Sequence, residues 1–374
     1  MAMLYLFVAI FLAMVGSCLN WNTESAVPAV FLFGDSTLDV GTNNFLNDSQ
    51  SRADMPFYGI DFPNKNATGR FSNGYNTADR IVKLLGFDES PPPYFFLLNS
   101  DTENFKSHIL KGVNFASGGS GILPETGKQN YIDVVSMGDQ IQQFKTVHDN
   151  ISQYLNGSAE ATINKSLFLV SAGSNDIFDF FFFNIDKNPG KSTLKVLEFI
   201  SKLMSNYQAH LKNLYDLGAR KFGILSVPPI GCVPILSAFA DPSTHCVNEI
   251  NDVAQIFHVQ LDRMLQNLSS ECPGMKYSLG DSYNITFTMI NNADLLHLDN
   301  VTSACCGNQT FLVSGLIGVP CSPNATVCEN HNNYLFWDQF HPTEYVSTLA
   351  ASMLYNNGSE FVTPINFRLL VEDS

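Results

Sequence analysis

The sequence is poor in basic residues: it has 20 Lys and Arg against 35 Asp and Glu, which gives a net charge of −15. An acidic chain repels the phosphate backbone, so this balance argues against nucleic-acid binding. The sequence also lacks a glycine period and a sustained heptad, which excludes collagen-like and coiled-coil chains. Its 374 residues, 45% of them hydrophobic, exclude disorder and suffice for one large core or two modest ones.

Long hydrophobic runs are absent as well, so we predict no integral membrane span. The segment 4–15 is almost wholly apolar but too short to cross a bilayer, and a Gly-Ser-Cys turn follows it, as in a signal peptide. It departs from that pattern in one respect, because no Lys or Arg precedes Arg52. The alternative is a buried N-terminal helix. We interpret residues 1–26 as a signal peptide with an unfixed cleavage site, and predict a secreted, extracellular protein.

Glycosylation sequons support secretion. Because an Asn-rich chain contains such sequons by chance, we expect some of them to be unused. The eleven candidate asparagines are Asn47, Asn66, Asn150, Asn156, Asn164, Asn267, Asn284, Asn300, Asn308, Asn324 and Asn357.

The cysteines cluster in the second half of the chain. If Cys18 leaves with the signal peptide, seven remain, so at most three disulfides and one thiol are expected. The adjacent pair Cys305 and Cys306 is not expected to bond to itself, because that geometry strains the backbone. The spacing fits no tetrahedral zinc site, and no histidine stands at ligand spacing. We predict disulfides, first among them Cys232–Cys246, which closes a short local loop.

Short apolar runs alternate with amphipathic segments. The runs 29–33, 112–116, 167–171, 221–227 and 275–279 predict strands that end at Gly, Ser, Asn or Pro turns. The period of 3.6 over 194–214 and 248–268 predicts helices. This alternation predicts an α/β fold with a mostly parallel sheet covered on both faces. Ligands bind such sheets at the carboxyl ends of the strands, where all these turns lie.

Two segments could supply a serine nucleophile and its base. Ser36 follows the first predicted strand in a Gly-Asp-Ser turn, where nearby backbone N–H groups would favour a developing anion. Asp338 and His341 precede a helix predicted over 343–355, and their separation of three lets the carboxylate reach the imidazole Nδ1. The alternatives are an ordinary turn and an Asp that caps a helix beside a surface His.

A serine that attacks an acyl group also needs donors for the oxyanion, and two strand-end turns offer them. The turn 118–121 can present backbone N–H groups, and Asn175 can present its side-chain amide. A second Gly-Asp-Ser, ending at Ser282, follows the last predicted strand. We expect at most one of the two serines to be a nucleophile.

Taken together, these motifs resemble those of the plant-type GDSL esterase/lipases of the SGNH hydrolase superfamily. They follow the family's order over nearly the whole mature chain, so their combination is specific. The matching segments are Gly34–Gly41, Gly69–Gly74, Asn114–Gly119, Gly173–Asp176, Pro228–Cys232, Ala304–Gly307 and Phe336–Thr343.

The resemblance implies a three-layer α/β/α fold with a flavodoxin-like sheet, in a single hydrolase domain over residues 27–374. It implies Ser36 as nucleophile, His341 as base and Asp338 as the residue that orients it, and it makes Ser282 structural. The implied oxyanion donors are the Ser36 N–H, Asn175 and a glycine, with Gly119 as first choice and Gly121 as second. It implies no metal and no organic cofactor.

Two positions depart from the family's pattern. Tyr75 stands where a basic residue is usual, which could alter a surface pairing. Cys272 is outside the pattern, and we expect it to be the unpaired thiol. The aromatic run 177–183 either lines an acyl pocket or lid, or packs on the core as the start of a helix. We interpret the run 91–96 as a rigid loop.

These features predict a secreted serine hydrolase that cleaves carboxylic esters of lipids or small molecules through an acyl-enzyme. One alternative is a secreted binding or modifier glycoprotein that keeps the fold without turnover, although the complete set of Ser, Asn, Asp and His argues against it. The other is an acyltransferase that uses the same triad with an alcohol as acceptor.

Overall fold

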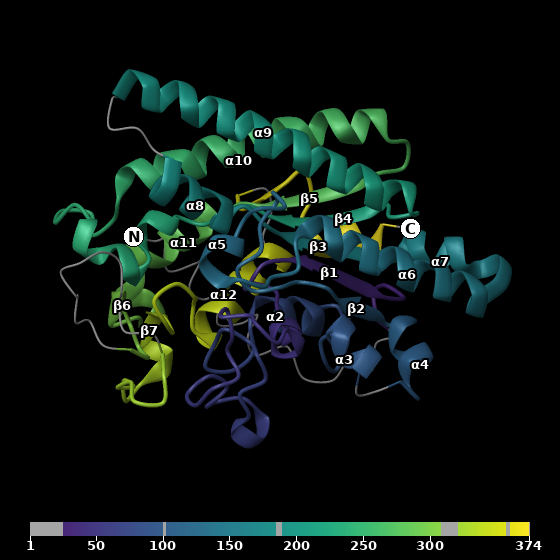
Figure 1. Cartoon of the computed structure of the whole chain (residues 1–374), viewed down its shortest axis with the longest axis horizontal. Coiled ribbons are helices and arrows are strands. Elements are labelled where there is room, and N and C mark those ends of the chain that lie inside the picture. Colours follow the sequence, from purple (N-terminus) through teal and green to yellow (C-terminus); the bar gives the residue numbers. More distant parts are fainter. Residues whose placement is uncertain (1–24, 100–101, 185–188, 308–320, 357–359, 374) are drawn as a thin grey trace, which may run out of the picture.

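The core of the computed structural model is a six-stranded sheet in the order β2-β1-β3-β4-β5-β8 (Figure 1). The first five strands are parallel and β8 is antiparallel. The five predicted strands are confirmed, with ends that differ by at most two residues: β1 Val30–Gly34, β2 Gly112–Asn114, β3 Leu167–Ser171, β4 Lys221–Leu225 and β5 Lys276–Gly280. The sixth strand, β8 Val362–Thr363, was not predicted.

The structure describes residues 25–99, 102–184, 189–307, 321–356 and 360–373. Almost all of the predicted signal peptide lies outside these ranges, as do Cys18, Asn308 and Asn357. Among the described residues, no helix is both long enough and apolar enough to cross a membrane.

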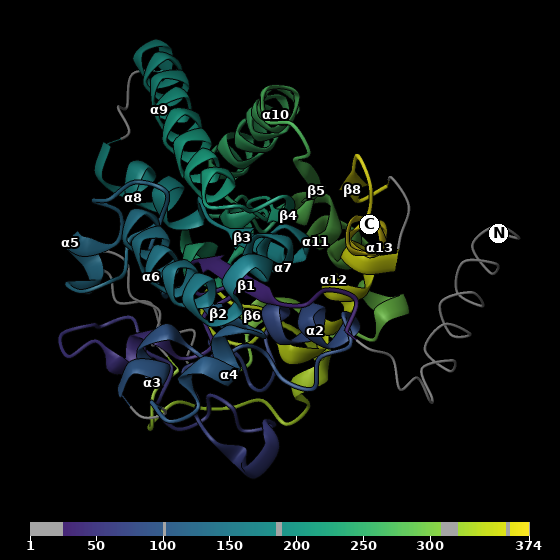
Figure 2. The ribbon, with the colours of Figure 1, turned by 90° about the vertical axis from the view of Figure 1, so that its right-hand side faces the viewer.

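Helices cover both faces of the sheet, which confirms the predicted three-layer α/β/α arrangement (Figure 2). One face carries α6 Met137–Leu155, α9 Pro189–Asp216 and α10 Asn248–Glu271, and the other carries α2 Thr77–Leu84, α12 Glu344–Asn356 and α13 Phe367–Glu372. The strands β1, β3 and β4 are buried along their whole length because both faces are covered. The remaining helices are α3 Tyr94–Asn99, α4 Phe105–Ile109, α5 Lys128–Tyr131, α7 Ala159–Lys165, α8 Ser174–Asn184 and α11 Ser282–Asn291.

The two helices predicted from their period are α9 and α10. Along α10 the predicted apolar stripe is buried, including Phe257 and Leu261 at 0% exposure. Along α9, however, Leu194 and Leu197 are 64% and 50% exposed. Val196, which lies between them, is buried with Ile200 and Leu203, so the buried stripe of α9 runs through these residues and leaves the two leucines outside it. The run 91–96 is also corrected, because α3 begins at Tyr94 directly after the three prolines.

Three disulfides join the predicted cysteines. Cys232–Cys246 is present as predicted, and Cys272 is free and buried. The other two, Cys305–Cys328 and Cys306–Cys321, lie beside a small sheet of β6 Asn300–Ala304 and β7 Tyr334–Phe336. The backbone N–H groups of Cys305 and Cys306 donate to the carbonyls of Phe336 and Trp337. These bridges therefore support the segment that leads to Asp338.

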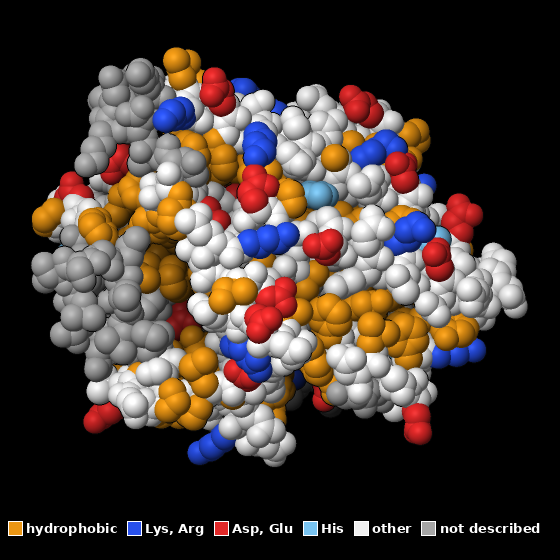
Figure 3. Space-filling model, in the orientation of Figure 1, with side chains coloured by type: hydrophobic (Ala, Val, Ile, Leu, Met, Phe, Trp, Pro, Cys, Tyr) orange, Lys and Arg blue, Asp and Glu red, His pale blue; other side chains and the backbone are white. Residues whose placement is uncertain are grey.

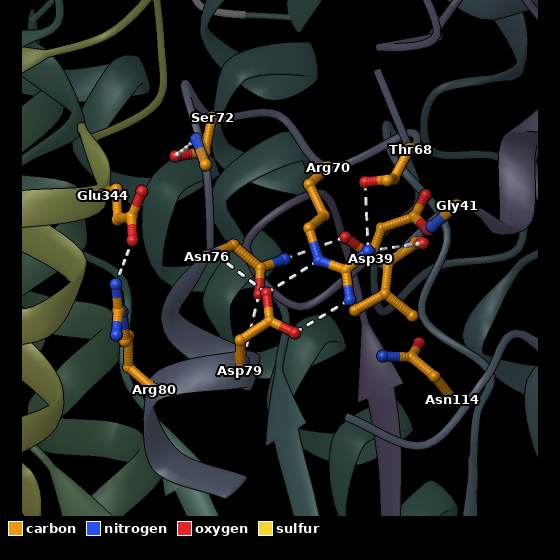
Figure 4. Close-up of polar contacts among 12 residues, drawn as sticks. Asp39, Gly41, Thr68, Arg70, Ser72, Asn76, Asp79, Arg80, Asn114 and Glu344 are labelled. Atoms are coloured by element: carbon orange, nitrogen blue, oxygen red, sulfur yellow. Dashed lines mark hydrogen bonds and ion pairs between the residues drawn. The ribbon is translucent and has the colours of Figure 1, made fainter. Parts of the chain in front are cut away.

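An ion-pair network ties the irregular segment 46–74 to α2. Arg70 donates from Nε and Nη2 to the two carboxylate oxygens of Asp79, at 2.7 and 2.8 Å (Figure 4). Asp79 also closes a capping box with Asn76 at the start of α2. Tyr75, which departs from the pattern of the family that the sequence resembles, forms a cation–π contact with Arg80. The guanidinium carbon lies 4.9 Å from the centre of the Tyr75 ring.

Candidate active site

The nucleophile candidate follows a turn that the backbone of Gly34 makes possible. Gly34 has φ 127°, and a Cβ there would lie 1.8 Å from the carbonyl oxygen of Ser171 on the neighbouring β3. Gln140 on α6 holds the same residue from the side: its Oε1 accepts from the Gly34 N–H at 2.8 Å, and its Nε2 donates to the Gly34 carbonyl at 2.9 Å. Ser36 is thereby placed at the carboxyl end of β1.

Three side chains from the two ends of the chain form one hydrogen-bonded row. The Ser36 Oγ lies 2.7 Å from His341 Nε2. On the other side of the ring, His341 Nδ1 lies 2.9 Å from both carboxylate oxygens of Asp338. This is the geometry in which an imidazole can take the serine proton while a carboxylate fixes its tautomer.

Asp338 is buried, at 3% exposure, but its charge is well compensated. Its Oδ1 accepts from the backbone N–H groups of Phe340 and His341, both at 2.8 Å, and its Oδ2 accepts from the hydroxyl of Tyr58 at 2.8 Å. Burial alone would raise the pKa of this carboxyl, but the charge of His341, its side-chain hydrogen bond and the two backbone N–H donors lower the pKa below its ordinary value. Asp338 is therefore ionised at neutral pH.

Donors for an oxyanion lie around the same point. The backbone N–H groups of Ser36 and Gly119 donate to no other described residue, and both residues line the cavity described below. Asn175 lines it too, and its Nδ2 donates to the carbonyl of Ser120 at 2.9 Å, which uses one of its two amide hydrogens. Gly121 is not part of the cavity wall; a Cβ there would lie 2.4 Å from Asp176.

The turn that carries Gly119 is fixed by polar side chains of the first loop. Asp39 Oδ2 accepts from the Gly118 N–H, and Asn43 Nδ2 donates to the Gly118 carbonyl, both at 2.8 Å. Burial raises the pKa of Asp39 to about 6, against the lowering effect of its backbone donors and of Arg70. On the far side, Asp176 accepts from the N–H groups of Ile122 and Leu123. The turn is held at both ends.

A cavity of about 500 Å³ contains this row and continues into the protein. Its inner wall is built from one stripe each of two helices, at helical spacing of three to four residues. The stripe on α11 comprises Ser282, Ile285, Thr286 and Met289, and the stripe on α12 comprises Val346, Ser347, Ala350 and Leu354. The wall is mostly apolar, so it suits an apolar group better than a charged one.

Ser282, the second Gly-Asp-Ser serine, lies in the wall of the same cavity. It is the first residue of α11, whose cap is Asp281, and its N–H donates to the Ser226 hydroxyl at 3.2 Å. No described histidine lies within hydrogen-bonding distance of the Ser282 hydroxyl. The two serines therefore share a cavity but only Ser36 has a base.

The aromatic run 177–183 forms part of α8 and divides between the two roles considered for it. Phe178 lines the cavity and meets Phe340 edge to face, with ring centroids 5.8 Å apart. Phe180 is buried on the other side and stacks on Phe199 of α9 at 4.2 Å. One helix thus serves both as cavity wall and as core.

Several residues that support the row carry no signal in the sequence. Tyr58 and Gln140 lie far along the chain from their partners, at separations of 280 and 106 positions, in segments with no recognisable motif. Phe71, by contrast, lies inside the Gly69–Gly74 motif, and its ring lies 4.8 Å from that of His341.

Among the described residues, no group of three or more His, Cys, Asp and Glu could hold a metal ion.

Comparisons with known proteins concern the chain as a whole. Among solved structures, a GDSL-like lipase from Parabacteroides merdae covers 88% of this chain and 95% of its own, at 10% identity and a TM-score of 0.37. The family described as GDSL-like lipase/acylhydrolase matches residues 30–354. A GDSL esterase/lipase of Arabidopsis thaliana is 35% identical over 347 residues, which cover 92% of this chain and 91% of that protein. GDSL esterase/lipase 6 of the same plant is 33% identical over 353 residues, covering 93% and 92%. The family match and the two plant relatives show that this chain, from β1 to α12, belongs to the GDSL-like lipase/acylhydrolase family.

Proposed function

We propose that the protein is a secreted serine hydrolase that cleaves carboxylic esters through a Ser36–His341–Asp338 triad and an acyl-enzyme. The observation that carries this proposal is the row of hydrogen bonds from Ser36 Oγ to His341 Nε2 at 2.7 Å and from His341 Nδ1 to Asp338 at 2.9 Å. Membership of the family supports ester hydrolysis as the type of reaction.

The first half of the reaction acylates the serine. His341 Nε2 takes the proton of Ser36 as Oγ attacks the ester carbonyl carbon, and Asp338 stabilises the resulting imidazolium. The negative charge moves to the carbonyl oxygen, where the N–H groups of Ser36 and Gly119 and the amide of Asn175 are the candidate donors. The tetrahedral intermediate then expels the alcohol, which takes the proton from His341. The acyl group remains bonded to Ser36.

Water completes the cycle by the same route. His341 removes a proton from water as the water oxygen attacks the acyl carbon. The bond to Ser36 Oγ then breaks, Oγ takes the proton back from His341, and a carboxylic acid is released. The inner cavity between α11 and α12 would receive the acyl group, because its wall is mostly apolar and begins beside the nucleophile. An alcohol in place of water would make the protein an acyltransferase.

Secretion is supported by three independent features. The apolar segment 4–15 fits a signal peptide, the structure contains three disulfides, and every described sequon asparagine is exposed or half-buried.

The extent of the domain is supported by the core. One contiguous buried cluster includes residues from Val27 to Val371, which supports a single hydrolase domain over 27–374.

Hydrolysis of p-nitrophenyl butyrate by the purified glycoprotein tests the proposal, with Ser36→Ala and Ser282→Ala as a matched pair. Both substitutions remove one hydroxyl from the same cavity. We expect Ser36→Ala to lower kcat by several orders of magnitude and Ser282→Ala to retain most of it. Loss of activity in the Ser282 variant alone would refute the assignment of the nucleophile. A wild-type protein that binds but does not turn over esters would support the binding-protein alternative, and ester products formed with added alcohol would reveal transfer.

A further inference from the structure

We infer that Tyr58 is a positioning residue for the base His341. Its hydroxyl holds Oδ2 of Asp338 in place, and by sharing the negative charge of that carboxylate it limits how strongly Asp338 stabilises the protonated His341. This inference rests on the proposed triad. The Tyr58 hydroxyl donates to Asp338 Oδ2 at 2.8 Å, and the residue is buried, at 7% exposure. Tyr58 would act through Asp338 and need not touch the reacting atoms.

Tyr58 and His341 are the two side chains that bond to the Asp338 carboxylate. His341 Nδ1 lies 2.9 Å from both oxygens; Oδ1 also accepts two backbone N–H groups from its own loop, and Oδ2 also accepts from Tyr58. Among the described residues, no side chain other than these two donates to this carboxylate. Without the Tyr58 hydroxyl, a buried charged oxygen would depend on His341 alone.

Tyr58 also belongs to a continuous aromatic wall behind the base. Its ring meets that of Phe71 at 6.1 Å in an edge arrangement, and Phe71 in turn lies 4.8 Å from the imidazole of His341. Both aromatic residues come from the irregular segment 46–74. The segment therefore contacts the carboxylate and the imidazole with two side chains at once.

This segment is anchored without the Tyr58 hydroxyl, which separates a positioning role from a merely structural one. Two backbone bonds hold the segment together internally: the Gly59 N–H donates to the Ser72 carbonyl at 2.9 Å, and the Asp61 N–H donates to the Asn73 carbonyl at 2.7 Å. The bidentate pair of Arg70 with Asp79 anchors the segment to α2 (Figure 4). Replacing Tyr58 by Phe keeps the ring contact and removes one hydrogen bond to a charged group.

The direction of the effect follows from electrostatics. A donor on Oδ2 disperses the negative charge of Asp338, so its loss leaves more charge facing the imidazole and favours the imidazolium. Burial, followed by the charge of Asp338, raises the pKa of Tyr58 well above its ordinary value, so the hydroxyl stays protonated. Three other described titratable groups lie close to the pair: Asp35 interacts electrostatically with His341, Tyr131 interacts with Asp338, and Arg52 lines the same cavity. None of them changes in the variant.

The test compares Tyr58→Phe with Tyr345→Phe, which removes a hydroxyl that donates to the Leu296 carbonyl at 3.1 Å, away from the triad. We expect Tyr58→Phe to fold normally and to lower kcat roughly 3- to 30-fold with KM nearly unchanged. In a plot of kcat against pH, the fall of kcat on the acid side (the acid limb) should move to higher pH. Tyr345→Phe should change neither the rate nor the limb. A Tyr58→Phe enzyme with the wild-type rate and profile would overturn the inference, as would a rate loss that matches a fall in thermal midpoint while the limb stays in place.

A second readout does not depend on turnover. In the Ser36→Ala background, NMR titration of the His341 ring should show proton uptake at higher pH when Tyr58→Phe is added. An unchanged titration curve would refute the role of the hydroxyl even if the proposed ester hydrolysis stands. Absence of all ester turnover in the wild-type protein would instead refute the proposed function, and the titration would still decide whether Tyr58 tunes His341.

Discussion

Asn175 lies where β3 has ended and α8 begins, and its amide has two hydrogens to place. One is donated to the Ser120 carbonyl at 2.9 Å, which fixes the side chain against the glycine-rich turn. The other is available in the cavity that holds Ser36. The contact with Ser120 is therefore compatible with a role as oxyanion donor, and it also gives Asn175 a structural function that an experiment must separate.

We predict that Asn175→Ala lowers kcat roughly 10²–10³-fold, as loss of one oxyanion donor typically does, with little change in KM. Asn175→Asp should be no better, because its carboxylate repels both the growing oxyanion and the Ser120 carbonyl. Steady-state kinetics and the thermal midpoint are measured on the same samples. A well-folded alanine variant with near-normal kcat would remove Asn175 from the site, and a rate loss that follows unfolding would make it a turn residue.

At the residue scale, the sequence could identify groups that react but few that position them. Ser36, Asp338 and His341 stand in motifs beside strand ends, and the structure brings them together. Tyr58 and Gln140 have no such signature, because a buried hydroxyl or amide that meets a distant partner leaves no local pattern. Their contacts arise from the way that distant segments pack.

At the scale of elements, the duplicated Gly-Asp-Ser shows the limit of a short motif. Both copies follow a parallel strand, and the structure places both serines in the wall of one cavity. They differ in what packs above them: the loop before α12 brings His341 to the end of β1, whereas β5 is followed by the capped start of α11. The sequence order of the strands was predictable, but their spatial neighbours were known only through the family resemblance.

The stripe on α12 should determine the acyl length that the enzyme accepts. Ala350 lies between Val346 and Leu354 on that stripe and lines the same cavity as His341. We predict that Ala350→Phe lowers kcat/KM for p-nitrophenyl decanoate about 10-fold or more, because the ring fills space that a long chain needs. Activity on the acetate ester should stay within about threefold.

The matched control for this prediction is Ser352→Phe, since Ser352 is half-buried on the same helix but does not line the cavity. It should leave the chain-length profile as in the wild type. An equal loss on acetate and decanoate in the Ala350 variant would place the acyl chain elsewhere. A selective loss in the control variant would show that the effect comes from disturbance of α12.

At the scale of the whole molecule, the net charge of −15 is distributed without a large field of one sign on the face seen in Figure 3, where acidic and basic side chains are interspersed. The acidic groups of most consequence are internal. Asp35, Asp39 and Asp338 are buried in loops, and Asp79 and Asp176 are buried in the first turns of α2 and α8. They hold loops in place, so the pH dependence of folding is tied to the architecture of the site.

Asp35 provides a measurable case. It is 1% exposed and lies directly before Ser36, and its Oδ1 accepts from the Thr37 N–H at 3.0 Å. Burial raises the pKa of this carboxyl from 3.8 to about 6, although the Thr37 donors and His341 oppose the rise. The native state therefore holds a proton that the unfolded chain has already released between these two values. Because the native state binds more protons there, stability falls as the pH rises from about 4 to about 6.

We predict that Asp35→Asn removes this contribution, since the amide oxygen can still accept from Thr37 but cannot ionise. A shift of 2.2 pKa units, from 3.8 to about 6, corresponds to roughly 3 kcal/mol at most. Urea unfolding with the disulfides intact, at pH 4 and at pH 7, gives the free energy of unfolding for both proteins. The wild type should lose up to that amount relative to the variant between the two pH values. Parallel pH dependences would mean that Asp35 ionises in the folded protein as it does in the unfolded chain, and that its burial is fully compensated by its hydrogen bonds.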